Sequence, residues 1–199
     1  MQVFDDIVTE SQANEIEKLI IHGDWPWYIG GDDKYGWEGG TVVPEETEKY
    51  MAIDKNVKEH IQMVHTLIYY DDVKELSTIN SSEAERIVEL LNPLIKRIGA
   101  QDGTIFRLKA NLTTQYKESL PGTYSTPHND ISKKHMVVIY YVNDSDGDTF
   151  VFDDDGKIIK RVSPKKGRFF MFDGRLKHAG SHPYDNTMRV VINFNVEFF

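Results

Sequence analysis

Residues 136–152 read MVVIYYVNDSDGDTFVF, an apolar and aromatic run followed by a polar turn and a second short apolar run. The first run, 136–142, is typical of a strand that is buried on both faces. Residues 143–148 carry Asn, Asp, Ser and Gly, which favour turns, and 149–152 return as a strand. The stretch therefore predicts two buried strands joined by a tight turn.

The same pattern extends over the chain from residue 104 onward. Further strands are predicted over 104–114, 157–162, 168–172 and 188–196, with tight turns between neighbours and no intervening helix. A series of short strands of this kind indicates an antiparallel sandwich or jelly roll, the double-sheet arrangement that protects strand edges. We expect a mainly β fold with helices packed on its outside.

The amino-terminal part is expected to support this core. A short strand over 2–4 precedes a helix that begins near Thr9 or Ser11, either of which is a suitable N-cap. At 199 residues the chain suits one domain, in which 1–103 supply helical support and N-terminal strands and 104–199 form the jelly-roll core.

Two further segments have helical spacing of their apolar residues. One spans 56–70, where the β-forming residues of 64–70 leave a strand as the alternative. The other spans 81–98, with Pro93 expected to bend or interrupt it. His60 and His65 do not share a helix face well, and we expect both to be structural or surface residues.

The composition limits the possible partners and compartments. A net charge of −9 repels phosphate backbones, so nucleic acid is not the expected partner. The absence of cysteine excludes disulfides and thiolate chemistry and is compatible with a reducing cytoplasm. The start of the chain does not resemble a signal peptide, and no run approaches the ~18 apolar residues of a membrane span. We therefore expect a cytoplasmic protein.

His128 and Asp130 lie two positions apart, shortly before the buried strand at 136–142. On a strand, alternate side chains point to the same face, so both can reach one metal ion. His178 adds a second imidazole at a later strand end, and Arg189 follows on the final strand. Two histidines and one carboxylate on one face of an octahedral metal leave the other positions open, an arrangement associated with non-haem Fe(II).

Each of these residues also has a plainer interpretation. Asp130 can orient His128 within a loop, His178 can be a surface histidine, and Arg189 can be an exposed strand residue. His182 is an alternative to His178 as the metal ligand. His135 lies too close after Asp130 to join the set and is expected to be structural.

All three tryptophans fall among glycines within residues 22–40. One interpretation is an irregular strand and loop whose aromatic residues cap the core. The other is an aromatic wall or lid over a substrate, formed by Trp25, Trp27 and Trp37 together with Tyr124. Both interpretations stay open from the sequence.

Several motifs after residue 104 occur in a fixed order. They are Tyr116 through a Pro-Gly loop to His128-x-Asp130; 137-VVIYYVN-143; 147-GDTF-150; 164-PKKGRFFMF-172; and His178 followed by 188-MRVVINF-194. In this order and spacing the chain resembles the Fe(II)- and 2-oxoglutarate-dependent dioxygenases, and within them the prolyl 4-hydroxylase-like group. The resemblance covers residues 104–199, with a looser likeness in the opening strand and helix.

The resemblance implies a double-stranded β-helix that binds Fe(II) through the two histidines and the aspartate described above. It implies that 2-oxoglutarate chelates the iron and that Arg189 clamps its distal carboxylate, for which a planar guanidinium is suited. Tyr141 is implied as a hydroxyl donor to the same carboxylate, and Tyr116 as a further co-substrate contact. O2 would take the remaining position, ascorbate is a candidate reductant, and succinate and CO2 would form as a substrate C–H bond is hydroxylated.

The sequence departs from the group's pattern in two places. Residues 146–149 read Asp-Gly-Asp-Thr where Gly-Gly-Glu-Thr is usual, and Arg189 stands where the group often has lysine. We expect the first to alter a turn and the second to serve the same anion.

The leading functional hypothesis is hydroxylation of a peptidyl residue, with proline as the first candidate. A free amino acid or another small molecule is the alternative substrate. A nucleic-acid demethylase of the same superfamily is disfavoured by the net charge and by the single arginine in the final strand. A non-catalytic cupin-like binding protein is disfavoured because both the metal-ligand and the anion-binding residues are present. The sequence predicts no oligomeric state.

Overall fold

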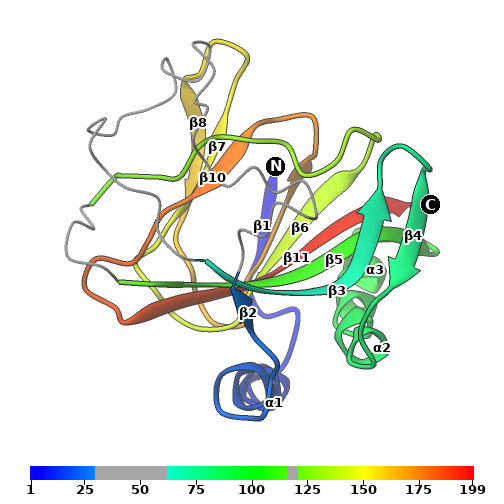
Figure 1. Cartoon of the computed structure of the whole chain (residues 1–199), viewed down its shortest axis with the longest axis horizontal. Helices are drawn as coiled ribbons and strands as arrows, with labels where there is room; N and C mark the ends of the chain where they lie inside the picture. Colours follow the sequence, from blue (N-terminus) through cyan, green and yellow to red (C-terminus); the bar gives the residue numbers. More distant parts are fainter. Residues whose placement is uncertain (30–61, 116–120) are drawn as a thin grey trace.

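Two β-sheets face each other in the computed structural model, which describes residues 1–29, 62–115 and 121–199 (Figure 1). Most strands of the larger sheet follow the order β1 (Gln2–Phe4), β9 (Phe169–Asp173), β6 (Met136–Tyr141), β11 (Met188–Phe198), β5 (Gly103–Thr114), β3 (Met63–Asp71) and β2 (Tyr28–Ile29), and β4 (Leu76–Ile79) pairs with β3. The smaller sheet has the order β10 (His178–Gly180), β7 (Thr149–Phe152) and β8 (Ile158–Val162). Neighbouring strands are antiparallel, as expected of a jelly roll.

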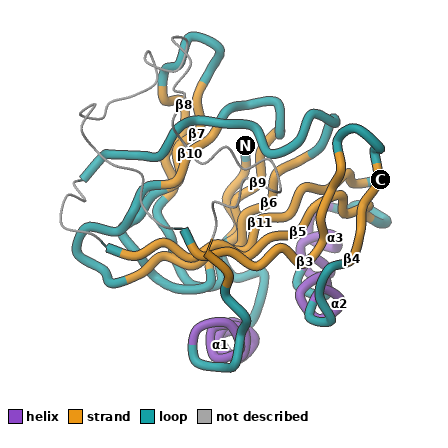
Figure 2. Tube along the Cα trace, viewed as in Figure 1, coloured by secondary structure: helices purple, strands orange, loops and turns teal. Residues whose placement is uncertain are grey.

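The helices cover one face of the larger sheet and the smaller sheet covers the other (Figures 1 and 2). Because side chains alternate along a strand, β11 sends Ile192 and Phe194 to the helix side and Asn193 to the other side. The helix-side core also contains apolar residues of α1 (Glu10–Ile21), α2 (Ala84–Val88) and α3 (Leu91–Ile98). The inner face, between the two sheets, is therefore the place where polar side chains of the long strands meet.

The amino-terminal helix forms as the sequence predicts. Thr9 is its N-cap, and its side chain accepts a hydrogen bond from the Gln12 backbone while the Gln12 side chain accepts one from the Thr9 backbone. Ala13, Ile16 and Ile20 are buried on one side, which docks α1 on the sheet. None of the helices in the described ranges is long and apolar enough to cross a bilayer.

For the described part of residues 56–70 the helix interpretation is wrong, and the strand alternative over 64–70 is confirmed. Met63–Asp71 form strand β3, which pairs with β5 from Met63 opposite Leu112 to Ile68 opposite Leu108. The β-forming residues and the free edge of β5 outweigh the apolar spacing that suggested a helix. Residues 56–61 and His60 lie outside the described ranges, whereas His65 is buried with its ring 4.8 Å from that of Trp25.

The segment predicted as one helix over 81–98 is divided into α2 and α3. Pro93 occupies the first turn of α3, where a backbone N–H would have no acceptor within the helix. The helix ends at Gly99, whose φ of 73° is the left-handed conformation that glycine adopts without a Cβ clash.

Gly147, in the turn before β7, is required by a close approach. A Cβ at this position would come within 2.7 Å of the Ser181 carbonyl oxygen and 2.8 Å of Arg189 Cδ. The turn therefore brings its backbone against the Arg189 side chain, which positions part of the site described next.

Candidate active site

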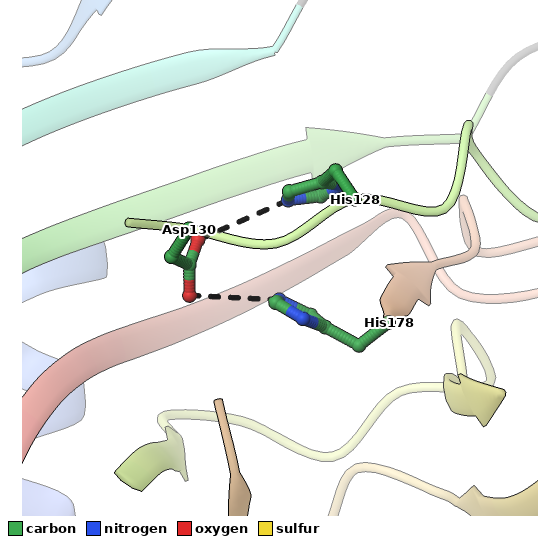
Figure 3. A group of neighbouring side chains, drawn as sticks. All are labelled: His128, Asp130 and His178. Atoms are coloured by element: carbon green, nitrogen blue, oxygen red, sulfur yellow. Dashed lines mark ion pairs between the residues drawn. The ribbon is translucent and has the colours of Figure 1, made fainter. Parts of the chain in front are cut away.

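Three potential ligand side chains converge at the junction of the two sheets (Figure 3). One ligand atom of each of His128, Asp130 and His178 can be chosen so that all lie within 4.8 Å of one another. His128 Nε2 is 3.9 Å from Asp130 Oδ1, and His178 Nε2 is 3.6 Å from Asp130 Oδ2. Two imidazoles and one carboxylate in this arrangement suit a divalent transition metal with open positions.

Backbone pairing between two distant segments brings the histidines together. His128 and His178 form an isolated antiparallel bridge, in which each backbone N–H donates to the other's carbonyl oxygen at 3.0 Å. Their rings lie with centroids 4.7 Å apart, and Asp130 follows in a bend. The strand conformation expected for both residues is thus found at His128 and does not extend to Asp130.

Asp130 is held by residues of the two longest strands of the sheet. Arg107 Nη1 of β5 donates to Oδ1 at 3.1 Å, while Asn193 Nδ2 and Asn195 Nδ2 of β11 donate to Oδ2 at 2.9 and 2.8 Å. Only 4% of the Asp130 side chain is exposed. A buried carboxylate needs such donors, because an unpaired buried charge is strongly unfavourable.

The protonation states of the set suit metal binding at neutral pH. Burial by itself would raise the pKa of Asp130, but the charges of His178, Arg107 and His128 lower it well below its ordinary value. Burial lowers the pKa of His178 to about 4. Asp130 is therefore ionised and His178 neutral near pH 7, which are the forms that bind metals.

A buried guanidinium lies at one end of the inner face. Arg189 donates from Nε to the Gly147 carbonyl oxygen at 2.6 Å and from Nη2 to Thr149 Oγ1 at 2.8 Å. Its Nη1 lies so close to Gly180 that an added Cβ there would approach it to 3.2 Å. Two hydrogen bonds along one edge of the guanidinium thus hold Arg189 in place. Burial lowers the pKa of its side chain.

Tyr141 contacts the same hydroxyl group as Arg189. Its phenol donates to Thr149 Oγ1 at 2.8 Å, and burial raises the pKa of the phenol to about 12, so it remains protonated. Because Thr149 Oγ1 accepts from both Tyr141 and Arg189, its own proton is directed toward a third acceptor. Thr149 is a site residue that the sequence interpretation missed.

The residues between Arg189 and Asp130 fit an anionic, oxygen-rich co-substrate such as 2-oxoglutarate. Thr113 lies opposite Arg189 in the β5–β11 register, and Asn111 lies opposite Val191. Thr113 Oγ1, Asn111 Oδ1 and Asn193 Oδ1 are buried without a hydrogen-bond partner among the described residues. The Arg189 guanidinium and the Thr113 hydroxyl can donate to the oxygen atoms of such a ligand, whereas the two amide oxygens can only accept.

The other predicted residues have different positions. Trp25 is buried in the helix-side core, on the sheet face opposite to Asp130, and Trp27 packs against that core. Tyr124 packs on Phe150 and Phe152 of β7, in the segment that precedes His128. Trp37 and Tyr116 lie outside the described residues.

Two further histidines were weighed from the sequence and lie apart from the ligand set. His182 Nδ1 contacts the Thr114 carbonyl oxygen at 3.0 Å, so it takes no place in the three-residue group. His135 is buried against Gly174 and its Nδ1 contacts the Lys133 carbonyl oxygen, consistent with a structural role.

The sequence interpretation also missed the polar residues that surround the metal-ligand set. They are Arg107, Lys109, Asn111 and Thr113 on β5, and Asn193 and Asn195 on β11. Lys109 is buried, and this burial, together with the charge of Arg107, lowers its pKa to about 7 although Asp130 acts in the opposite direction. Polar residues at every second position of a strand were the available signal, because they indicate a polar inner face.

Comparisons with known proteins agree with the geometry of the candidate site. Residues 113–197 match the family model of the 2OG-Fe(II) oxygenase superfamily. Comparison with curated protein sequences found no match. The family match contains all three ligand candidates and Arg189.

Solved structures of oxygenases share the fold at low identity. An oxidoreductase of the 2OG-Fe(II) oxygenase family from Burkholderia pseudomallei is similar with a TM-score of 0.66 and 14% identity, over 98% of this chain and 84% of that chain. A prolyl hydroxylase from Trichoplax adhaerens, in complex with a hypoxia inducible factor peptide fragment, has a TM-score of 0.58 and 13% identity, over 100% and 82%. A Pseudomonas putida prolyl-4-hydroxylase has a TM-score of 0.50 and 13% identity, over 98% and 90%. These likenesses confirm the mainly β, double-stranded β-helix fold.

Proposed function

We propose that the chain, which belongs to the 2OG-Fe(II) oxygenase superfamily, hydroxylates a C–H bond of a peptidyl substrate, with proline as the first candidate. As a member it is a dioxygenase that uses Fe(II), 2-oxoglutarate and O2. The observation that carries the proposal is the convergence of His128, Asp130 and His178 beside the polar inner face that ends at Arg189.

We propose His128, Asp130 and His178 as the iron ligands. The bound iron and co-substrate supply the oxidation, in which 2-oxoglutarate becomes succinate and CO2 and one oxygen atom enters the substrate. The chain's own residues supply binding and orientation. The neutral imidazole of His178 and the ionised Asp130 are ready for the metal at neutral pH.

Arg189 is proposed to bind the distal carboxylate of 2-oxoglutarate. Two of its nitrogen atoms are anchored on Gly147 and Thr149, which holds the guanidinium still and leaves its Nη1 side for the ligand. Thr149 adds a hydroxyl proton, since its oxygen already accepts from Tyr141 and Arg189. Tyr141 then acts through Thr149, which differs from the direct contact that the resemblance implied, and Tyr116 stays a prediction.

Two considerations favour a peptidyl substrate. Two of the similar folds are prolyl hydroxylases, and one of them is in complex with a peptide. The net charge of −9 disfavours a nucleic acid. We also propose that residues 1–199 form one oxygenase domain; the cytoplasmic location and the aromatic substrate wall stay predictions.

The proposal is tested by turnover with matched substrates. Purified protein with Fe(II), 2-oxoglutarate and O2 is incubated with prolyl peptides, with the same peptides carrying alanine for proline, and with free amino acids. We expect succinate to form fastest with a prolyl peptide, together with a product heavier by one oxygen atom. Asp130→Ala is the inactive control. Turnover of free amino acids alone would show a small-molecule hydroxylase, and no succinate under any condition would contradict the enzyme assignment.

A further inference from the structure

The hydrogen bonds of Asp130 leave room for a metal at one of its two oxygen atoms. An ionised carboxylate has about four acceptor positions, two on each oxygen. Both positions of Oδ2 are taken, by Asn193 Nδ2 at 2.9 Å and Asn195 Nδ2 at 2.8 Å. Oδ1 accepts one bond, from Arg107 Nη1 at 3.1 Å. The position that remains is therefore on Oδ1.

The three donors are fixed by the sheet. Arg107 and Asn195 are direct partners in the β5–β11 register, and Asn193 lies two residues along β11 on the same face. Arg107 Nη1 also donates to Asn195 Oδ1 at 3.2 Å, which requires the amide nitrogen of Asn195 to face Asp130. Asn195 is fully buried and 6% of Asn193 is exposed, so neither amide turns freely toward water.

We infer that Arg107, Asn193 and Asn195 form a carboxylate clamp that presents Oδ1 of Asp130 to the metal and withholds Oδ2. The inference rests on the proposed metal site. His178 Nε2 is 3.6 Å from Oδ2, but the acceptor positions of that oxygen are occupied by the two asparagines. The members of the carboxylate clamp contact Asp130 and are inferred to act through it, so they are positioning residues.

A monodentate aspartate matters for the number of open positions. If each of the three residues supplied one ligand atom, an octahedral metal would keep three positions for 2-oxoglutarate and O2. A bidentate aspartate would take one of these and leave no position for O2 beside the co-substrate. The carboxylate clamp thus protects the position on which the reaction depends.

The carboxylate clamp also explains why the positively charged Arg107 lies next to a site that is proposed to bind a metal cation. Arg107 Nη1 lies 3.1 Å from Oδ1 of the buried Asp130, so its guanidinium compensates the charge of the carboxylate. Its charge opposes the metal, whereas its hydrogen bond orients the oxygen that the metal needs. We expect orientation to dominate, since outer-shell substitutions typically cost about 10- to 100-fold in metal affinity.

The test measures Co(II) binding to the full chain without 2-oxoglutarate, by calorimetry and by the visible d–d absorption of Co(II). Arg107→Gln and Asn193→Ser should each weaken binding by about 10- to 100-fold. Asn193→Ser should also change the d–d spectrum, because Oδ2 gains a free position for the metal. Arg107→Lys should restore affinity to within a few-fold of the unmodified chain. Ile192→Val, on the helix-side face of β11, is the matched control and should change neither readout.

The outcomes separate this inference from the proposed metal site. If His178→Ala abolishes Co(II) binding while Arg107→Gln and Asn193→Ser keep the original affinity and spectrum, the clamp is wrong and the metal site stands. Tighter binding by Arg107→Gln would equally overturn it, because the guanidinium would then act only by repulsion. If His178→Ala leaves binding unchanged, the metal site itself is wrong. Circular dichroism establishes folding, and Asn193→Ser carries the test if Arg107→Gln does not fold.

Discussion

The inner face of the larger sheet has two halves of opposite character. On β6 and β9 it carries apolar side chains that pack against β7 and β8: Val137, Ile139, Phe170 and Phe172. On β5 and β11 it carries the polar and charged residues that surround Asp130 and Arg189. Buried polar atoms without partners lower stability, and three of them lie in the polar half. The apolar half therefore stabilises the fold, whereas the polar half is suited to binding ligands.

The largest expected effect is on stability in the apolar half. Phe170 is fully buried and its ring lies 4.9 Å from that of Phe172. Phe170→Ala should lower the free energy of unfolding by about 3–5 kcal/mol through the cavity that it leaves. Urea unfolding measures this change. The metal affinity of the protein that remains folded should change by no more than a few-fold. A larger loss of affinity would contradict the separate roles of the two halves.

The stability of the protein should depend on pH through His178, which lies at the boundary of the two halves. The pKa of His178 in the folded chain, about 4, lies below the ordinary value near 6.5. Between these two pH values the unfolded chain therefore binds more protons than the folded chain. The metal-free protein should therefore lose stability as the pH falls from about 6.5 to about 4, by up to about 3 kcal/mol. Urea unfolding at several pH values measures this slope. His178→Asn should reduce it, and an unchanged slope would show that His178 is not its source.

In the polar half, Arg189 should control co-substrate binding and leave metal binding nearly intact. Arg189→Met removes the charge and should weaken 2-oxoglutarate binding about 100-fold, while Arg189→Lys, which keeps the charge without the fork, should weaken it about 10-fold. Calorimetric titration of the Mn(II)-loaded protein compares the variants. Equal affinity of all three proteins would exclude Arg189 from the co-substrate site.

The smallest expected effect is at Thr113, opposite Arg189 in the polar half. Thr113→Val removes a hydroxyl that is buried without a described partner, so the free energy of unfolding should stay within about 1 kcal/mol or rise. If the hydroxyl donates to 2-oxoglutarate, the KM for 2-oxoglutarate should rise about 10-fold. A loss of stability with an unchanged KM would place Thr113 with the structural residues instead.

The sequence predicted most of the jelly roll, because its strands carry continuous or alternating apolar patterns between clear turns. It predicted His128, Asp130, His178 and Arg189 because their spacing resembles a known family. It left helix and strand open where β3 forms, since only pairing with β5 decides between them for those residues.

The surroundings of Asp130 could not be predicted in the same way. Arg107 and Asn195 are 88 positions apart and meet only through the register of β5 and β11, which no local pattern specifies. Thr149 was missed because its role depends on the two hydroxyl contacts that Tyr141 and Arg189 make with it. The sequence thus predicted the groups that we propose as ligand-binding residues, and the structure identified the residues that contact them.

The central claim is that His128, Asp130 and His178 hold Fe(II) so that 2-oxoglutarate can chelate it. The most direct measurement is the visible charge-transfer absorption of the anaerobic protein on addition of Fe(II) and 2-oxoglutarate together. We predict a band for the unmodified chain that requires both additions, disappears with O2 as succinate forms, and is absent from His178→Ala. No band from the folded, unmodified chain, or an equal band from His178→Ala, would contradict the account.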